Sequence, residues 1–132
     1  TAAQLCTLND LTTMGALFPG VEVVERTGID DPDWARCEWA DASFEPIDSA
    51  GDLFGINQRA HGGETLSDAF ESIDVPGADQ AVFAETLDND RMSVVLATVG
   101  DQILEIEFAK DALGARDVAT LIATTWSSFQ AL

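Results

Sequence analysis

The segment RMSVVLATVGDQILEIEF, Arg91–Phe108, decides the fold. Two apolar runs, Arg91–Val99 and Gln102–Phe108, are joined by the short turn Gly100-Asp101. A connection this short predicts antiparallel neighbours, because parallel strands need a long crossover. The first run is apolar on both faces, which predicts a central strand. The second alternates apolar and acidic residues, so we expect one of its faces in the core and the other turned outward.

Further elements are predicted on either side of this hairpin. Alternating or β-rich stretches bounded by turn residues predict four more strands, at Val21–Arg26, Ala35–Phe44, Leu53–Arg59 and Ala81–Leu87. Helical spacing after capping-box-like starts predicts an N-terminal helix over Leu8–Phe18 and a short one over Leu66–Ile73, which end at Pro19-Gly20 and Pro76-Gly77.

The last helix has the clearest amphipathic pattern. Its apolar stripe is expected to consist of Val118, Leu121, Ile122, Thr125 and Phe129. We expect it to cover the sheet face that carries Leu104 and Ile106. The predicted fold class is α+β: a single antiparallel sheet of five to six strands, with the N- and C-terminal helices packed on one face.

Length and charge exclude several function classes. The 132 residues suit one domain, residues 1–132, with a sizeable core. Twenty-four acidic residues against six basic ones give a net charge of −18. Such a surface repels phosphate backbones and anionic lipid headgroups, so we expect no nucleic-acid partner and no electrostatic membrane binding. No stretch approaches the roughly 18 apolar residues of a membrane span.

Two cysteines, Cys6 and Cys37, are the most informative single residues. Zinc sites use about four closely spaced ligands, and redox motifs use Cys-x-x-Cys, whereas these cysteines are 31 positions apart with His61 as the single histidine. A structural disulfide is the favoured interpretation, and two buried free thiols are the alternative. A disulfide would join the first helix to the strand of Cys37 and indicate an oxidising compartment. We expect no metal and no cofactor.

Other candidate site residues have common structural explanations. His61, beside Gly62-Gly63, is a candidate general base, although a lone loop histidine is more often plain surface. Glu105 and Glu107 share a strand face and can form an acid–base pair, but alternating charge on a solvated face is commoner. Trp34 and Trp126 are candidate binding residues or rim residues of the core.

Two acidic clusters are candidate calcium ligands. Asp30-Asp31-Pro32-Asp33 and Asp88-Asn89-Asp90 offer oxygen ligands, but neither continues into the EF-hand pattern. Both are better interpreted as turns.

The arrangement of these features resembles a family of actinobacterial secreted proteins and lipoproteins of unknown function. In this family an early cysteine opens a helix, a second precedes a tryptophan by two residues, and a Pro-Gly-x-Asp turn leads into three strands and a final helix. The matching positions are Cys6, Leu8, Leu11, Cys37, Trp39, Pro76-Gly77, Asp79 and Ala81. The resemblance implies a Cys6–Cys37 disulfide, export, often an N-terminal lipid anchor, and a helix-covered antiparallel sheet related to the PsbP-like fold. It carries over no catalytic residue.

The function expected from these observations is non-enzymatic binding outside the cytoplasm, by a secreted or lipid-anchored domain at the cell surface. The partner is a protein or a small apolar ligand at the cell envelope, held by the sheet face without helices or by the loops around Trp34 and His61. Two alternatives stay open: a hydrolase that uses His61 with nearby carboxylates, and an accessory subunit of an envelope complex.

Overall fold

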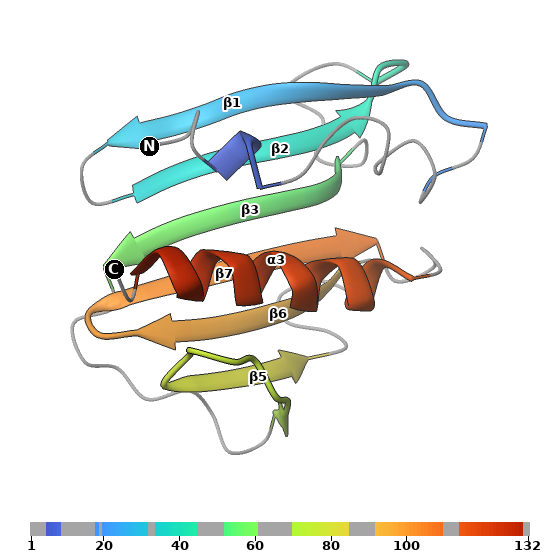
Figure 1. The fold of residues 1–132 in the computed structure, drawn as a ribbon. Helices are drawn as coiled ribbons and strands as arrows, with labels where there is room; N and C mark the ends of the chain where they lie inside the picture. Colours follow the sequence, from blue (N-terminus) through green and yellow to red (C-terminus); the bar gives the residue numbers. More distant parts are fainter. Residues whose placement is uncertain are drawn as a thin grey trace.

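A computed structural model describes residues 5–8, 18, 20–31, 34–44, 52–60, 70–84, 92–109 and 114–130. Within these ranges the chain forms one antiparallel sheet of seven strands in the order β1-β2-β3-β7-β6-β5-β4, with the helix α3 on one face (Figure 1). The elements are β1 (Val23–Asp31), β2 (Trp34–Asp41), β3 (Asp52–Ala60), β4 (Glu71–Ser72), β5 (Gln80–Ala84), β6 (Met92–Val99), β7 (Gln102–Ala109) and α3 (Ala115–Gln130).

The predicted fold class is wrong in its strand number and its helices. The described chain is mostly β, with seven strands instead of five or six, and α3 is its one full helix. Most of the predicted N-terminal helix, Leu8–Phe18, lies outside the described ranges, and just before it Leu5 and Cys6 have helical backbone.

The extra strand replaces the end of the predicted short helix. Glu71 and Ser72 form β4 by pairing with β5, and the Ile73 amide donates a hydrogen bond of 3.1 Å to the carbonyl of Ala81. Sheet pairing therefore satisfies the backbone groups that a helix would have used, so the apolar spacing of Phe70 and Ile73 does not produce a helix.

The hairpin at the centre of the prediction is confirmed. β6 and β7 pair in continuous register from Met92 opposite Ala109 to Val99 opposite Gln102. Every residue of β6 from Met92 to Thr98 is buried, as expected for a central strand. β7 alternates buried residues with partly exposed ones, so Leu104 and Ile106 face the core.

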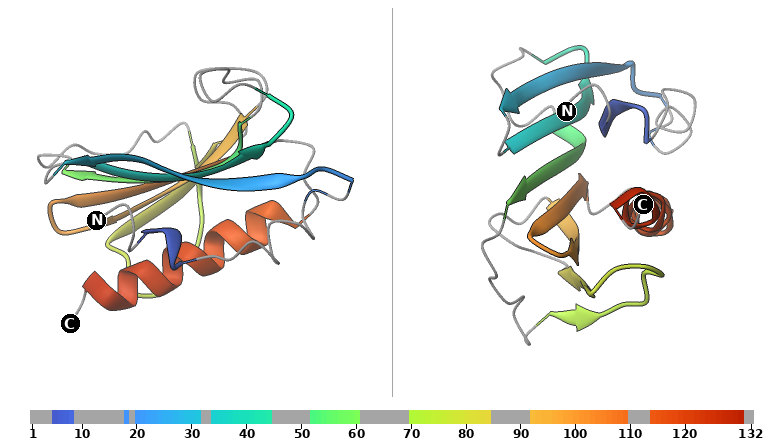
Figure 2. Two further views of the ribbon diagram at one scale, coloured as in Figure 1. Left: turned by 90° about the horizontal axis from the view of Figure 1, so that it is seen from above. Right: turned by 60° about the vertical axis from the view of Figure 1, so that its left-hand side comes forward.

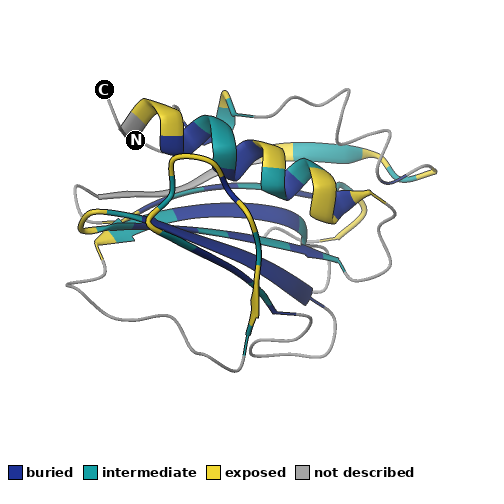
Figure 3. Cartoon of the chain, turned by 60° about the horizontal axis from the view of Figure 1, so that its bottom comes forward, coloured by how far each residue is buried: buried dark blue, intermediate teal, exposed yellow. Residues whose placement is uncertain are grey.

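α3 covers the expected face with a different stripe. Leu104 and Ile106 belong to the same buried cluster as the helix residues, and Figure 2 shows α3 lying against that side of the sheet. The buried helix residues are Ala115, Ala119, Ile122, Ala123, Trp126 and Ser127. The predicted stripe is therefore partly wrong, because Leu121 and Phe129 are 66% and 58% exposed. Small alanines let the helix approach the strands closely, and the large side chains of Leu121 and Phe129 stay exposed. Figure 3 shows that α3 carries both buried and exposed residues along its length.

The Pro76-Gly77-x-Asp79 turn is hydrogen-bonded to the turn end of the β6–β7 hairpin. Gly77 has a positive φ of 88°, which favours glycine. The Asp79 amide donates to the carbonyl of Thr98 at 2.7 Å, and its carboxylate accepts from the Gly100 amide at 2.8 Å. The motif that carried the family resemblance thus has a structural role here.

The predicted disulfide between Cys6 and Cys37 is confirmed, with Cα atoms 5.4 Å apart. Cys37 is fully buried on β2, on the same face as Trp39. The bond holds the turn of Cys6 against β2, and this turn lies on the same side of the sheet as α3 (Figure 2). One face of the sheet therefore carries both the disulfide and the helix.

Candidate functional site

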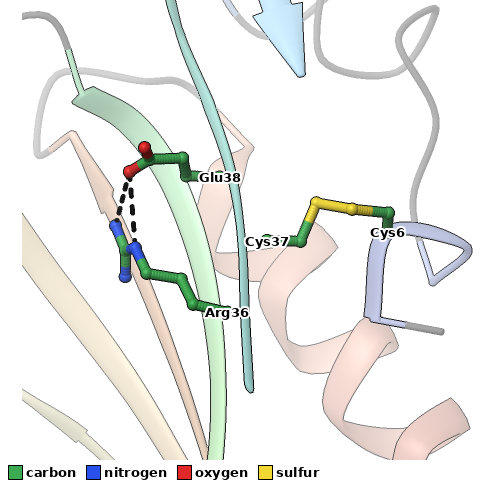
Figure 4. Close-up of a disulfide and its surroundings, with 4 residues drawn as sticks. All are labelled: Cys6, Arg36, Cys37 and Glu38. Atoms are coloured by element: carbon green, nitrogen blue, oxygen red, sulfur yellow. Dashed lines mark hydrogen bonds and ion pairs between the residues drawn. A yellow bond between two sulfur atoms is a disulfide. The ribbon is translucent and has the colours of Figure 1, made fainter. Parts of the chain in front are cut away.

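The opposite face of β2, β3 and β7 gathers charged and aromatic side chains. On β2, Arg36 and Glu38 alternate with Cys37 and lie on the other side of the strand from the disulfide (Figure 4). Residues that pair across neighbouring strands lie on the same face of the sheet, so the strand pairing identifies the residues of β3 and β7 that share this face. We call its members the open-face cluster: Trp34, Arg36, Glu38, Asn57, Arg59, Glu105 and Glu107.

Arg36 is the centre of this cluster. Its Nη2 atom lies 3.1 Å from Oε2 of Glu38 and 2.7 Å from Oε1 of Glu107. Burial alone lowers the pKa of Arg36, but the charges and hydrogen bonds of Glu107 and Glu38 together raise it above its usual value. Arg36 is therefore a permanent cation held between two carboxylates.

Gly55 makes this bridge possible. Glu107 is on β7, and β3 lies between it and Arg36, so the arginine side chain must cross β3. It crosses at Gly55, where an added Cβ would lie 2.7 Å from Nη2 and 3.0 Å from Cζ of Arg36. Glycine here serves a close approach of side chain to backbone, and its φ is not in the left-handed region.

Glu105 is the least compensated charge of the cluster. Its pKa is raised, first by burial and then by the charge of Glu107, while Arg59 and Arg36 act in the opposite direction. The ion pair with Arg59 is loose, with Nη2 and Oε2 3.6 Å apart. Asn57 on β3 and Leu96 on β6 lie opposite Glu105 on its two sides and are both buried. This environment penalises the ionised carboxylate.

Trp34 is the member of the cluster at the start of β2. Its side chain is 43% exposed, and its Nε1 donates to Oδ1 of Asn57 at 3.4 Å. It lies opposite Arg59 in the strand pairing. Of the candidate binding residues, Trp34 is thus a surface residue beside other polar groups.

Trp126 is not a surface residue. It is 2% exposed in the core, and its Nε1 donates to Oε1 of Gln58 at 3.1 Å. The third candidate, His61, lies outside the described residues, as does Asp88-Asn89-Asp90. Asp30 and Asp31, predicted as part of a turn, instead extend β1 by pairing with Ala35 and Trp34.

The sequence prediction missed the arginines and Asn57. The alternation Arg36-Cys37-Glu38 does place Arg36 and Glu38 opposite the cysteine, which is a usable signal. The pairing of Arg36 with Glu107 has no local signature, because the two residues meet only through the β2-β3-β7 strand order.

A small apolar cluster adjoins this face on β5, β6 and β7. Val82, Val94, Leu96 and Ile103 are buried there, and Phe70 packs against them. The side of the sheet opposite α3 is therefore polar over β2 and β3 and apolar toward β5.

One group among the described residues has metal-ligating atoms close together, namely Cys6, Glu25 and Cys37. The two sulfur atoms are bonded to each other, so no thiolate ligands are present in the oxidised protein. No helix in the described part of the chain has the length and hydrophobicity needed to cross a bilayer.

Comparison with protein-family models, curated proteins and solved structures finds no match to this chain.

Proposed function

We propose that this chain is a non-enzymatic, extracytoplasmic binding domain that recognises a protein partner through the open-face cluster. The observation that carries the proposal is the network around Arg36, in which ion pairs hold charged side chains in place and Gly55 leaves space for the guanidinium group. Pre-organised arginine and tryptophan side chains are characteristic anchors of protein interfaces.

The disulfide supports the location. Disulfides persist in oxidising compartments and are rare in the cytosol. Kinship with the exported actinobacterial family, and with it a lipid anchor at the cell surface, belongs to the same proposal. It is supported by the paired cysteines and by the Trp39 that follows Cys37 by two residues.

Charge favours a cationic partner. The chain carries a net charge of −18, and the open-face cluster has three carboxylates against two guanidinium groups. Complementary charge steers encounters and disfavours like-charged partners. A basic protein surface suits this face better than the small apolar ligand, because Trp34 and the partly exposed Arg59 lie in the polar part.

The hydrolase alternative is less well supported. His61 is outside the described residues, and Glu105 and Glu107 each face an arginine. Carboxylates in ion pairs with arginine are typical of a structural or binding role, although the raised pKa of Glu105 is also a property of general acids.

The test compares two surfaces of the oxidised protein. Quantitative cross-linking to extracytoplasmic proteins would use wild type, the double variant Trp34→Ala/Arg59→Ala, and the control Leu121→Ala/Phe129→Ala on the outer side of α3. We expect basic proteins to be cross-linked to wild type and to the Leu121→Ala/Phe129→Ala control, but not to Trp34→Ala/Arg59→Ala. Equal recovery with all three chains contradicts the proposal, as does a hydrolytic activity that disappears in His61→Ala.

A further inference from the structure

One corner of the open-face cluster has the chemistry of a cation site. This corner consists of Trp34, Asn57 and Glu105. Asn57 accepts a hydrogen bond from Trp34 and pairs with Glu105 across β3 and β7. Asn57 is only 7% exposed, so this amide is a fixed spacer between the indole and the carboxylate.

The carboxylate of Glu105 has 19% of its side chain exposed and the longest ion pair of the three carboxylates. Glu107 and Glu38 share Arg36, and Glu105 is left with the loose pair to Arg59. The Arg59 side chain is 38% exposed, so solvent screens that pair. A second cation at Glu105 would add an attraction that offsets the repulsion from Glu107.

The indole of Trp34 is partly exposed. Among the described residues, the cation–π contact that forms is Arg116 over Phe83 at 4.1 Å, at the other end of the sheet. Trp34 is 43% exposed, and its hydrogen bond to Asn57 orients the ring beside the cluster. Tryptophan is the strongest aromatic partner for an ammonium or guanidinium group.

We propose that the corner formed by Trp34, Asn57 and Glu105 binds a lysine or arginine side chain of a cationic polypeptide. This inference rests on the proposed function and names the chemical group that the face recognises. A polypeptide is favoured over a small cation because the excess of negative charge extends over the whole chain, so a multiply charged partner gains from it beyond the corner itself.

The probe is a ten-residue peptide with three lysines, and its control is the same peptide with all three lysines acetylated. Binding is followed by the indole N–H signals in NMR, at low and at physiological salt. Trp34 is the exposed tryptophan, whereas Trp39 and Trp126 are buried and provide internal references. Trp34→Phe assigns the signal.

Matched variants separate a local site from diffuse attraction. Glu105→Gln and Glu22→Gln each remove one negative charge, but the exposed Glu22 precedes β1 and lies outside the cluster. We expect Glu105→Gln to weaken lysine-peptide binding at least fivefold and Glu22→Gln less than twofold. Trp34→Leu lacks the reporting indole, so its binding is followed by backbone amide signals, and we expect it to be weakened about two- to fivefold. Thermal unfolding of each variant checks that it is folded.

Any one of three results overturns the inference. The first is that Glu105→Gln and Glu22→Gln weaken binding of the lysine peptide equally, and the second is that the acetylated peptide binds as tightly as the lysine peptide. The third is that the small polyamine spermidine, added in place of the peptide, shifts the Trp34 indole signal. If the lysine peptide fails while cross-linking still depends on Trp34 and Arg59, this inference is wrong and the proposed function stands. If the peptide binds as expected but cross-linking is the same for all variants, the proposed protein-binding function fails instead.

Discussion

Replacing Gly55 by alanine should break the bridge between Arg36 and Glu107. The added Cβ would lie 2.7 Å from Nη2, so the guanidinium must move outward by about 0.7 Å to reach ordinary contact. A shift of that size lengthens its 2.7 Å contact with Glu107 to as much as about 3.4 Å, beyond normal hydrogen-bond range.

Two opposing effects determine the net change in stability. Loss of a hydrogen bond between charged groups costs about 1.5–3 kcal/mol. Replacing a strand glycine by alanine gains about 0.5–1 kcal/mol, because the unfolded chain loses freedom. We therefore expect Gly55→Ala to lower the free energy of unfolding by about 1–2 kcal/mol. Urea unfolding of the oxidised protein measures this as a midpoint lowered by about 0.5–1 M for an m-value near 2 kcal/mol/M.

The control is a double-mutant cycle with Arg36→Met. Methionine keeps much of the side-chain length but has no guanidinium for the new methyl group to displace. In that background Gly55→Ala should be neutral or slightly stabilising. An equal loss of stability in both backgrounds would refute the bridge, because the cost would then come from the backbone of β3.

Three further predictions concern the disulfide, Glu105 and Asp79. Reduction, or Cys6→Ser with Cys37→Ser, should lower the free energy of unfolding by about 3–4 kcal/mol, since the bond closes a loop of about 32 residues; denaturant midpoints with and without reductant measure this, and equal midpoints contradict it. For Glu105 the folded-state pKa is raised, so its contribution is fully present below the unfolded pKa and is lost as pH rises toward the folded value. Glu105→Gln should therefore match wild type near pH 3.5 and be the more stable at pH 7; the reverse order in thermal unfolding across this range rules out the assigned environment. Asp79→Ala should cost about 0.5–1.5 kcal/mol by removing the acceptor of the Gly100 amide, with faster hydrogen exchange at that amide as the measurement, and unchanged exchange speaks against this contact.

The β6–β7 hairpin and the disulfide could be predicted because their signals are local or unique. The apolar run of β6 and the alternation of apolar and acidic residues in β7 are visible directly in the sequence, and they match the seven consecutive buried residues of β6 and the alternating burial of β7. Two cysteines without metal-ligand neighbours in sequence leave few alternatives to pairing with each other.

The number of strands was predicted wrongly because pairing between strands overrides the local helical preference of the residues in β4. β4 has two residues and exists because β5 offers it hydrogen-bond partners. The helical stripe failed for a related reason: Leu121 and Phe129 outweigh Ala119 and Ala123 on a hydropathy scale, but the sheet accepts the small residues because they allow close packing.

The open-face cluster was only half predictable. Glu105 and Glu107 share a face by simple alternation, as expected. Arg36 and Arg59 reach them from β2 and β3, and that contact depends on strand order and register, which single-strand patterns do not encode.

The central claim is that the sheet face opposite the disulfide and α3 is the binding face. The most direct measurement is an amide and indole chemical-shift map of the oxidised protein with the three-lysine peptide. We predict shifts centred on Trp34, Asn57 and Glu105, with the signals of Leu121 and Phe129 unmoved. Shifts centred on Leu121 and Phe129 would contradict the claim and place the binding surface on the outer side of α3.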